Sequence, residues 1–248
     1  MPSQSKRLCV FGDSHIGSLR KALDAGLIKS AGFEIEFWGA TGPQFRQIDI
    51  IDGVVRPTSP QAAEMVAQVN GQGREALAPG DFDIYLFFGA RLRMADFMPP
   101  YLQRLRDPQN GISAAVLEAG ARGFLADRRM ARIARNFGAS GKSRVFFAPA
   151  PLWTWGIQDN AAAQKLADDY PLAVDAGKTD RDMIWEVFQQ IFEPDGVTLL
   201  RQPEETVTRG IFTDPKYAAE GAQDSGDIGH KSAEYAALVF KSFLKAAK

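Results

Sequence analysis

The stretch CVFGDSHIGSL, residues 9–19, passes from an apolar run into a polar group and then into a helical pattern. The apolar part is typical of a buried strand. The polar group Gly12-Asp13-Ser14-His15 therefore falls where a first strand would end. Three interpretations fit it: an ordinary strand-to-helix turn with Ser14 as helix cap, the metal-binding start of a phosphoesterase, or the nucleophile turn of a serine hydrolase.

The composition is that of an ordinary globular protein. The 248 residues are 45% hydrophobic and 24% charged, and the net charge of −1 gives no long-range field to attract nucleic acid or an anionic membrane. The single cysteine, Cys9, excludes an internal disulfide and a multi-cysteine zinc site. No signal peptide precedes the polar group, and no run approaches the ~18 apolar residues of a membrane helix. We expect a soluble cytoplasmic protein without nucleic-acid or membrane partners.

Strand-like and helical segments alternate along the chain. Strands are predicted at residues 7–13 and 81–90 from apolar runs, at residues 33–42 from an alternating run, and at residues 143–153, with a candidate fifth strand at residues 195–203. Helical patterns cover residues 17–32, 112–138 (with a break near Gly120 or Gly123) and 231–247. Between the second and third strands we expect a small hairpin around Asp52-Gly53 and a short helix from Pro60. This alternation predicts one domain over residues 1–248, a parallel sheet covered by helices on both faces.

The carboxyl ends of the predicted strands carry the residues suited to chemistry. Active sites of parallel α/β sheets lie at this edge. Gly12-Asp13-Ser14, Gly42, Gly89 and Pro149 all fall there.

Other motifs are excluded by their context. NFGASGKSRV lacks the first glycine of a phosphate-binding P-loop, and it lies between a helix and a strand in the wrong order. The G-x-S-x-G of the α/β-hydrolase nucleophile elbow is absent. GDSHIG resembles the D-x-H opening of metallophosphoesterases, but the chain has only two histidines, His15 and His230, and a two-metal site needs more. We therefore expect no metal and no other cofactor.

The stretch DIGHKSAEY near the carboxyl end supplies an acid and a base. Asp227 precedes His230 by three residues, and a carboxylate beside an imidazole fixes its tautomer and stabilises the imidazolium. With Ser14 the chain order is Ser, Asp, His. A hydroxyl is a weak nucleophile until a histidine acts as its base, and the start of a helix after Ser14 favours a developing oxyanion.

Together FGDSHIGSL and the later DIGH resemble the GDSL/SGNH hydrolases, a family of esterases with a flavodoxin-like sheet. The resemblance implies a three-layer α/β/α fold on a five-stranded parallel sheet. It implies that Ser14 is the nucleophile and that Asp227 and His230 complete the triad. In the second block, GATG, Gly42 matches the glycine whose N–H contributes to the oxyanion hole better than Gly39 does.

The third block departs from the family, because Arg91 in FFGARL stands where the family has an asparagine that donates to the oxyanion. Two placements of Arg91 are open. Its guanidinium points into the cleft, where it replaces the missing amide or binds an anionic part of the substrate. Alternatively it pairs with a carboxylate or faces solvent and leaves a two-donor hole. We expect the first placement, and so an oxyanion hole of Ser14, Gly42 and Arg91.

Several nearby residues have simpler interpretations. Asp224 is a possible substitute for Asp227, and Asp13 is expected to hydrogen-bond within its turn. We expect His15 to be structural or to line a pocket, because a residue adjacent to Ser14 points elsewhere. Trp153 and Trp155 are candidates for stacking on a sugar ring or are ordinary half-buried aromatics. The charged stretch ADRRMARIARN, residues 126–136, is expected to be the solvated face of a helix.

The function expected from the sequence is hydrolysis of a carboxylic ester through an acyl-enzyme. The family and the two tryptophans favour an O-acetylated carbohydrate as substrate. The alternative is a weak or inactive relative that binds a glycan or an acyl ligand, and Arg91 is the feature that favours it.

Overall fold

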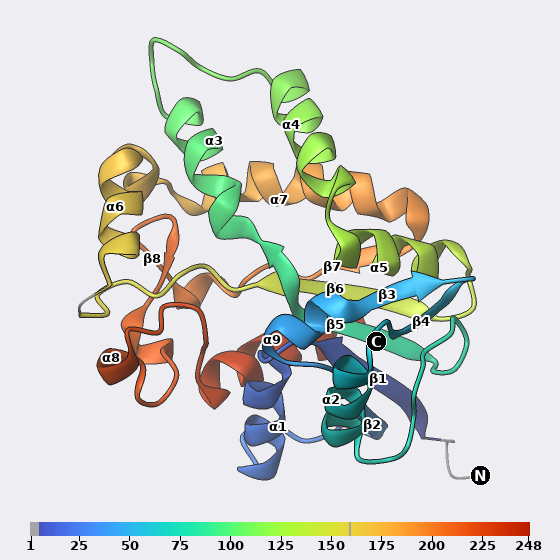
Figure 1. Cartoon of the computed structure of the whole chain (residues 1–248). Coiled ribbons are helices and arrows are strands. Elements are labelled where there is room, and N and C mark those ends of the chain that lie inside the picture. Colours follow the sequence, from blue (N-terminus) through green and yellow to red (C-terminus); the bar gives the residue numbers. More distant parts are fainter. Residues whose placement is uncertain (1–4, 159) are drawn as a thin grey trace.

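A five-stranded parallel sheet forms the centre of the computed structural model, which describes residues 5–158 and 160–248 (Figure 1). Its strands are β1 (Lys6–Gly12), β2 (Phe33–Gly39), β5 (Ile84–Arg93), β6 (Arg144–Ala150) and β7 (Val197–Leu199). They lie in the order β2-β1-β5-β6-β7. Counted within the sheet this is 2-1-3-4-5, the flavodoxin-like order. The fold class predicted from the sequence is confirmed.

The central strands β1, β5 and β6 contain continuous apolar runs because both faces of the sheet are buried there. In β1, Leu8 and Val10 face one hydrophobic core, and Cys9 and Phe11 face the other. The same alternation runs through β5 and β6. A strand covered on both faces has no solvent side, so its sequence shows a continuous apolar run instead of an alternating one.

Helices form the two outer layers (Figure 1). One face of the sheet is covered by α1 (Ile16–Asp24) and α9 (Ala233–Ala246). The other is covered by α5 (Arg129–Ala139) and α7 (Lys178–Phe192), on which α3 (Met98–Leu105) and α4 (Ala114–Ala126) pack. The helix α2 (Pro60–Asn70) lies against β2. Two short helices, α6 (Ala161–Asp169) and α8 (Ala222–Ser225), lie in the connections that follow β6 and β7.

The expected hairpin and the short helix after it are both present. The hairpin consists of β3 (Ile48–Ile51) and β4 (Val54–Pro57), and its turn residues Asp52 and Gly53 have φ values of 53° and 76°. Positive φ at both central residues matches the right-handed twist of a two-residue hairpin, and Asp-Gly is a favoured pair for it. The helix α2 begins at Pro60 after Ser59, whose hydroxyl accepts a hydrogen bond from the N–H of Ala62.

The long helical stretch is broken, but at another place than predicted. It forms α4 and α5, which meet at Asp127-Arg128, and both Gly120 and Gly123 lie inside α4. Arg128 has an extended backbone, φ −91° and ψ 100°. Gly120 has a packing role inside α4, because its missing side chain leaves room for Tyr101, whose hydroxyl oxygen would lie 1.8 Å from a Cβ there.

The region between β6 and β7 contains α6 and α7, neither of which the sequence analysis assigned. A small hairpin, β8 (Val207–Thr208) and β9 (Phe212–Thr213), follows β7 and was not predicted either. Among the helices of residues 5–158 and 160–248, none has the length and apolarity to cross a membrane. The cytoplasmic location stays a prediction.

Candidate active site

Ser14 lies in the turn between β1 and α1, at the carboxyl edge of the sheet. The N–H of Ile16 donates to the carbonyl of Asp13 (3.1 Å) and the N–H of Gly17 to that of Ser14 (3.2 Å), so the turn leads directly into the helix. The residue at the capping position is His15, and its side chain makes no capping bond. Ser14 is therefore not the side-chain cap of α1, and its hydroxyl lies beside the positive end of a helix.

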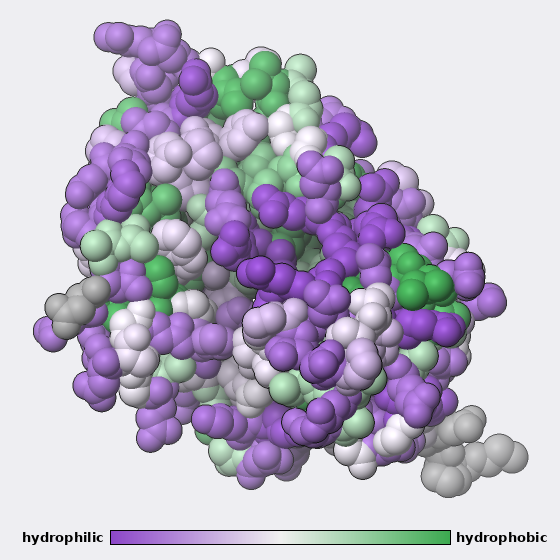
Figure 2. Space-filling model, in the orientation of Figure 1, coloured by the Kyte–Doolittle hydropathy of each residue, from purple (hydrophilic) through white to green (hydrophobic). Residues whose placement is uncertain are grey.

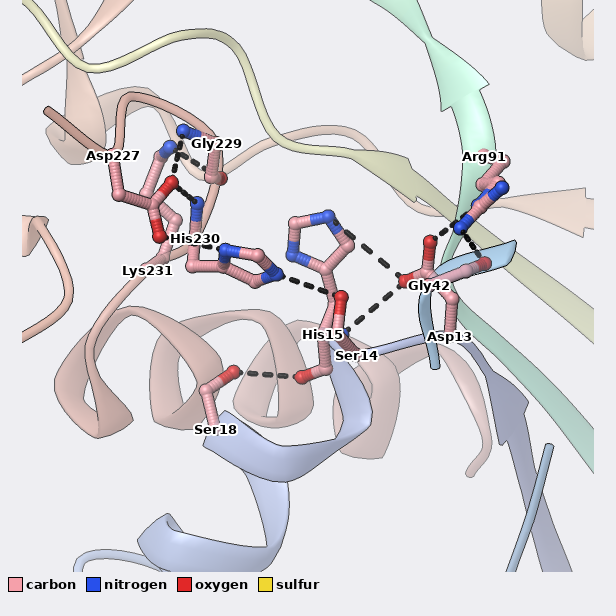
Figure 3. A network of polar contacts seen from close by, with 10 residues as sticks. All are labelled: Asp13, Ser14, His15, Ser18, Gly42, Arg91, Asp227, Gly229, His230 and Lys231. Atoms are coloured by element: carbon pink, nitrogen blue, oxygen red, sulfur yellow. Dashed lines mark hydrogen bonds and ion pairs between the residues drawn. The ribbon is translucent and has the colours of Figure 1, made fainter. Parts of the chain in front are cut away.

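The structure brings Ser14, His230 and Asp227 together, although 216 residues separate the first two (Figure 3). The Oγ of Ser14 lies 2.7 Å from Nε2 of His230. The Nδ1 of the same ring lies 2.7 Å from Oδ2 of Asp227. Each distance is that of a hydrogen bond, so hydroxyl, imidazole and carboxylate form one continuous chain. Asp224, the alternative acid, is exposed on α8 and forms no hydrogen bond or ion pair with His230 in the described part of the chain.

The Asp227 carboxylate is oriented by its own turn. Its Oδ1 accepts the backbone N–H groups of Gly229 (2.8 Å) and His230 (3.0 Å), which leaves Oδ2 for the imidazole. Burial raises the pKa of Asp227, but the hydrogen bonds from the N–H and ring of His230 and from the N–H of Gly229 outweigh it. The pKa of Asp227 therefore lies below its ordinary value, and the carboxylate stays ionised beside the ring.

A buried lysine follows the histidine in sequence. Lys231 is 4% exposed, and its Nζ donates to the carbonyls of Ile228 (2.9 Å) and Gly229 (2.8 Å). Burial lowers the pKa of Lys231 to about 7, against a smaller opposite effect of Asp227. The carbonyl of Ile228 also accepts the N–H of Thr154 (2.9 Å). The turn that carries His230 is thus stabilised by the Lys231 ammonium and by the backbone of the loop that follows β6.

His15 lies beside His230 and is largely buried. The two ring centroids are 5.1 Å apart, and Nε2 of His15 is 4.0 Å from Oδ1 of Asp13. Burial lowers the pKa of His15 to about 4, a shift that the nearby Asp13 opposes. A neutral ring adds no positive charge next to His230. Its packing needs Gly89, which has φ +62° and whose Cβ would lie 2.4 Å from Cβ of His15. The pocket-lining role expected of His15 agrees with this placement.

Two backbone N–H groups at the site have no acceptor in the described chain. Neither the N–H of Ser14 nor that of Gly42, the first residue of the short helix η1 (Gly42–Gln47), donates a hydrogen bond within the described residues. Both residues line one cleft together with His230. Free N–H groups beside a nucleophile are what an oxyanion hole requires.

Arg91 pairs with a carboxylate, which is the second of the two placements considered. Its Nε donates to Oδ2 of Asp13 (2.9 Å) and its Nη2 to the carbonyl of Gly42 (2.6 Å) (Figure 3). The pairing of β5 with β6 slips between Phe88 and Arg93, and Arg91 itself has φ 48°. This irregularity turns the side chain towards Asp13. Two of its three guanidinium nitrogens are occupied, and Asp13 needs the charge because it is only 4% exposed. Arg91 also lines the cleft, so its role as third oxyanion donor stays a prediction that this pairing does not support.

The cleft around Ser14 has a volume of about 730 Å³. In Figure 2, hydrophilic side chains gather around a hollow near the middle of the viewed face. Trp153 is half-buried and lines the cleft. Trp155 does not, because the chain turns at Trp155-Gly156 and the indole packs on Phe212, with ring centroids 4.9 Å apart. Only the first of the two predicted sugar-stacking tryptophans therefore has a place beside Ser14.

Some residues of the site were missed by sequence reasoning. Lys231 was assigned only to a helix, and nothing in its sequence context distinguishes a buried lysine from an exposed one. Arg128 and Arg129 were assigned to a solvated helix face, yet both line the cleft, because the chain leaves α4 just before them. The described residues contain no cluster of three or more side chains suited to holding a metal ion.

Comparison with known proteins gives structural likenesses only. No family model matches the sequence, and no curated protein matches it. The periplasmic domain of a lipopolysaccharide acetyltransferase from Salmonella ser. Paratyphi A is 12% identical, with a TM-score of 0.38 over 98% of this chain and 84% of that one. An extracellular lipase from Streptomyces rimosus is 10% identical, with a TM-score of 0.46 over 98% and 100% of the two chains.

A third likeness is to a protein assigned as a GDSL-like lipase from Bacteroides ovatus ATCC 8483. It is 11% identical, with a TM-score of 0.36, and 97% of this chain matches about half (52%) of that protein. Because the identities and TM-scores are low, we argue function from the geometry of the site.

Proposed function

We propose that the protein is a serine esterase that cleaves a carboxylic ester through an acyl-enzyme. The observation that carries the proposal is the chain of two hydrogen bonds of 2.7 Å from the Ser14 hydroxyl through His230 to Asp227. The order Ser, Asp, His and the D-x-x-H motif are those of the GDSL/SGNH hydrolases that the sequence resembles. A purely structural serine would have no need of an imidazole that is itself oriented by a carboxylate.

In the proposed reaction, Oγ of Ser14 attacks the ester carbonyl while Nε2 of His230 accepts the hydroxyl proton. Asp227, held ionised, stabilises the imidazolium that forms. The imidazolium then protonates the leaving alcohol. Water repeats the sequence on the acyl-enzyme and releases the acid, with His230 again as base. No metal or organic cofactor takes part in these steps.

The oxyanion is proposed to bind to the N–H groups of Ser14 and Gly42. Support comes from the freedom of both groups and from the start of α1 two residues after Ser14, where the helix dipole favours negative charge. Arg91 does not act as the third donor but anchors the Gly42 carbonyl. Loss of one oxyanion donor lowers kcat by about 100- to 1,000-fold in other hydrolases, so we expect a modest turnover number.

The substrate class proposed is an O-acetylated carbohydrate. The half-buried Trp153 in the lining supports it, because an indole face suits the apolar face of a sugar ring. The alternative from the sequence, binding without catalysis, gains weight from Arg91, which leaves no third donor. The oriented imidazole weighs against it.

The experiment that tests the proposal is hydrolysis of p-nitrophenyl acetate by wild type, Ser14→Ala, His230→Ala and the double variant. Each single change should lower kcat by roughly 1,000-fold or more, and the double change should lower it little further, because the residues act as one unit. Ser18→Ala is the matched control. Its hydroxyl lies one helical turn away and donates to the carbonyl of His15 (2.8 Å), so activity should stay within about twofold of wild type. Equal rates for wild type and Ser14→Ala would refute the proposal.

A further inference from the structure

The cleft beside Ser14 is rich in arginine. Two aspartates, Asp13 and Asp127, contribute carboxylates to its lining. Five arginines from three separate parts of the chain line the same cleft: Arg46 on η1, Arg91 and Arg93 at the end of β5, and Arg128 and Arg129 at the start of α5. The protein as a whole has a net charge of −1, so the positive charge is a local property of this cleft.

Three of the five arginines have no carboxylate partner among the described residues. Arg91 pairs with Asp13 (2.9 Å), and Arg93 pairs with Asp96 (3.0 Å). Within the part of the chain that the structure describes, Arg46, Arg128 and Arg129 form no ion pair at 4.0 Å or less. Even if Asp127 offsets one of these charges, the cleft keeps an excess of positive charge.

The contacts of Arg128 and Arg129 do not neutralise their positive charge. Both Nη atoms of Arg129 donate to backbone carbonyls, those of Phe45 (2.8 Å) and Arg46. Arg128 lies over the ring of Phe124, with 4.3 Å from its guanidinium carbon to the ring centroid. The Nε atoms of Arg128 and Arg129 are buried without an acceptor in the described chain. Buried unpaired donors are unfavourable, so an arrangement that keeps them needs a compensating interaction.

The positively charged arginines of this cluster repel one another. Burial lowers the pKa of Arg129, and the neighbouring Arg91, Arg132 and Arg46 lower it further, while Asp49 opposes them. Mutual repulsion of guanidinium groups is relieved by a bound anion. The planar guanidinium fork matches carboxylate, sulfate and phosphate oxygens, and it donates two parallel hydrogen bonds to them.

We propose that the cleft selects an ester that itself carries an anionic group, a carboxylate, sulfate or phosphate, which is bound by Arg46 and Arg128. The inference deepens the proposed esterase function and depends on it for turnover. On a carbohydrate, it means an acidic sugar ester in place of a neutral one. Arg129 forms the back of this anion site and holds η1 against α5 through its two carbonyl contacts.

The test compares pairs of similar esters of which one member carries a free carboxylate and the other is neutral. On the leaving-group side the pair is 4-acetoxybenzoate and its neutral methyl ester. On the acyl side it is p-nitrophenyl hydrogen glutarate, ionised at neutral pH, and p-nitrophenyl butyrate. In at least one pair, wild type should have a kcat/KM about tenfold higher for the anionic ester at low salt, mainly through KM. The preference should shrink as NaCl is raised, because the arginines are partly exposed. The pair that shows the preference tells on which side of the ester bond the anion lies.

Variants locate the anion site. In Arg46→Gln/Arg128→Gln the ratio of kcat/KM for the anionic over the neutral ester should fall about tenfold. The matched control is Arg56→Gln, since Arg56 is an exposed arginine on β4 that does not line the cleft, and it should keep the wild-type ratio. Circular dichroism and thermal melting check that each variant is folded.

Binding to Ser14→Ala separates this inference from the esterase proposal. Calorimetric titration with 4-acetoxybenzoate, p-nitrophenyl hydrogen glutarate and their neutral counterparts measures anion recognition without turnover. Tighter binding of an anionic ester, lost in the two-arginine variant, supports the anion site even if wild type hydrolyses no ester. Hydrolysis by wild type without any preference for the anionic member of either pair overturns the anion site and leaves the esterase standing. An unchanged preference in Arg46→Gln/Arg128→Gln overturns it as well.

Discussion

At the scale of single residues, the site is organised around two hydrogen-bonded side-chain pairs with different tasks. His230 with Asp227 orients the proposed base, whereas Arg91 with Asp13 organises the neighbouring backbone. Asp13 receives the N–H of His15 on one oxygen and Arg91 on the other, and Arg91 also holds the carbonyl of Gly42. The turn that carries Ser14 and the start of η1 are therefore fixed to each other by one guanidinium.

Removal of Arg91 should leave the Asp13 carboxylate buried without a counter-charge. We predict that Arg91→Ala lowers the free energy of unfolding by about 3 kcal/mol, the lower end of the range for a broken buried pair, because part of Arg91 faces the cleft. The double variant Asp13→Asn/Arg91→Ala should lose clearly less than the sum of the single losses. Denaturant unfolding of the four proteins measures this coupling. Strictly additive losses would show that the two side chains act independently.

At the scale of elements, the turn of residues 227–230 is stabilised by Lys231, a lysine whose pKa is lowered by burial. The folded-state pKa of Lys231 is about 7, below its ordinary 10.5. Between these two values the unfolded chain binds more protons than the folded one, so the free energy of unfolding rises with pH across this window. Below the folded-state value the lysine is charged in both states, and the penalty of burying that charge is fully present.

The matched variant Lys231→Met keeps the length of the side chain and removes its titration. We predict that the free energy of unfolding of wild type, relative to Lys231→Met, increases as pH rises from about 7 to 10.5. Chemical denaturation of both proteins across that range measures the difference, in which other titrating groups cancel. A difference that stays flat with pH would mean that the buried amine is not destabilised by its surroundings.

The helix α4 allows a second element-scale prediction, because it contains two glycines in different surroundings. A Cβ at Gly123 would have no atom within 4 Å, so Gly123→Ala should stabilise the protein by about 1 kcal/mol through helix propensity. A Cβ at Gly120 would lie 1.8 Å from the hydroxyl oxygen of Tyr101, whose ring stacks on Phe97 with centroids 4.2 Å apart. Gly120→Ala should therefore destabilise it. Thermal melting distinguishes the two, and a rise in Tm for both would show that Tyr101 moves aside freely.

At the scale of the whole molecule, the sequence was most informative about the sheet and its carboxyl edge. Apolar runs reveal strands that are buried on both faces, and the motifs around Ser14 and His230 stand at an edge where chemistry is expected. The break between α4 and α5 was misplaced because a single glycine inside a helix is tolerated, and the chain turns instead at Arg128, whose extended backbone no helix-breaking residue signals. The placements of Arg91 and Trp155 could not be predicted for a similar reason. The direction of a side chain depends on a local irregularity of the backbone, which composition and periodicity do not encode.

The measurement that tests the central claim most directly is labelling of the folded protein with a fluorophosphonate, followed by mass spectrometry to locate the adduct. A phosphonylating reagent reacts with a serine hydroxyl that has an oriented base and an oxyanion site, and spares ordinary serines. We predict a single adduct on Ser14 that forms at least roughly 100-fold more slowly in His230→Ala and does not form on the unfolded chain. An adduct on another serine, or labelling of Ser14 at an equal rate in His230→Ala, would contradict the assignment of Ser14, His230 and Asp227 as one catalytic unit.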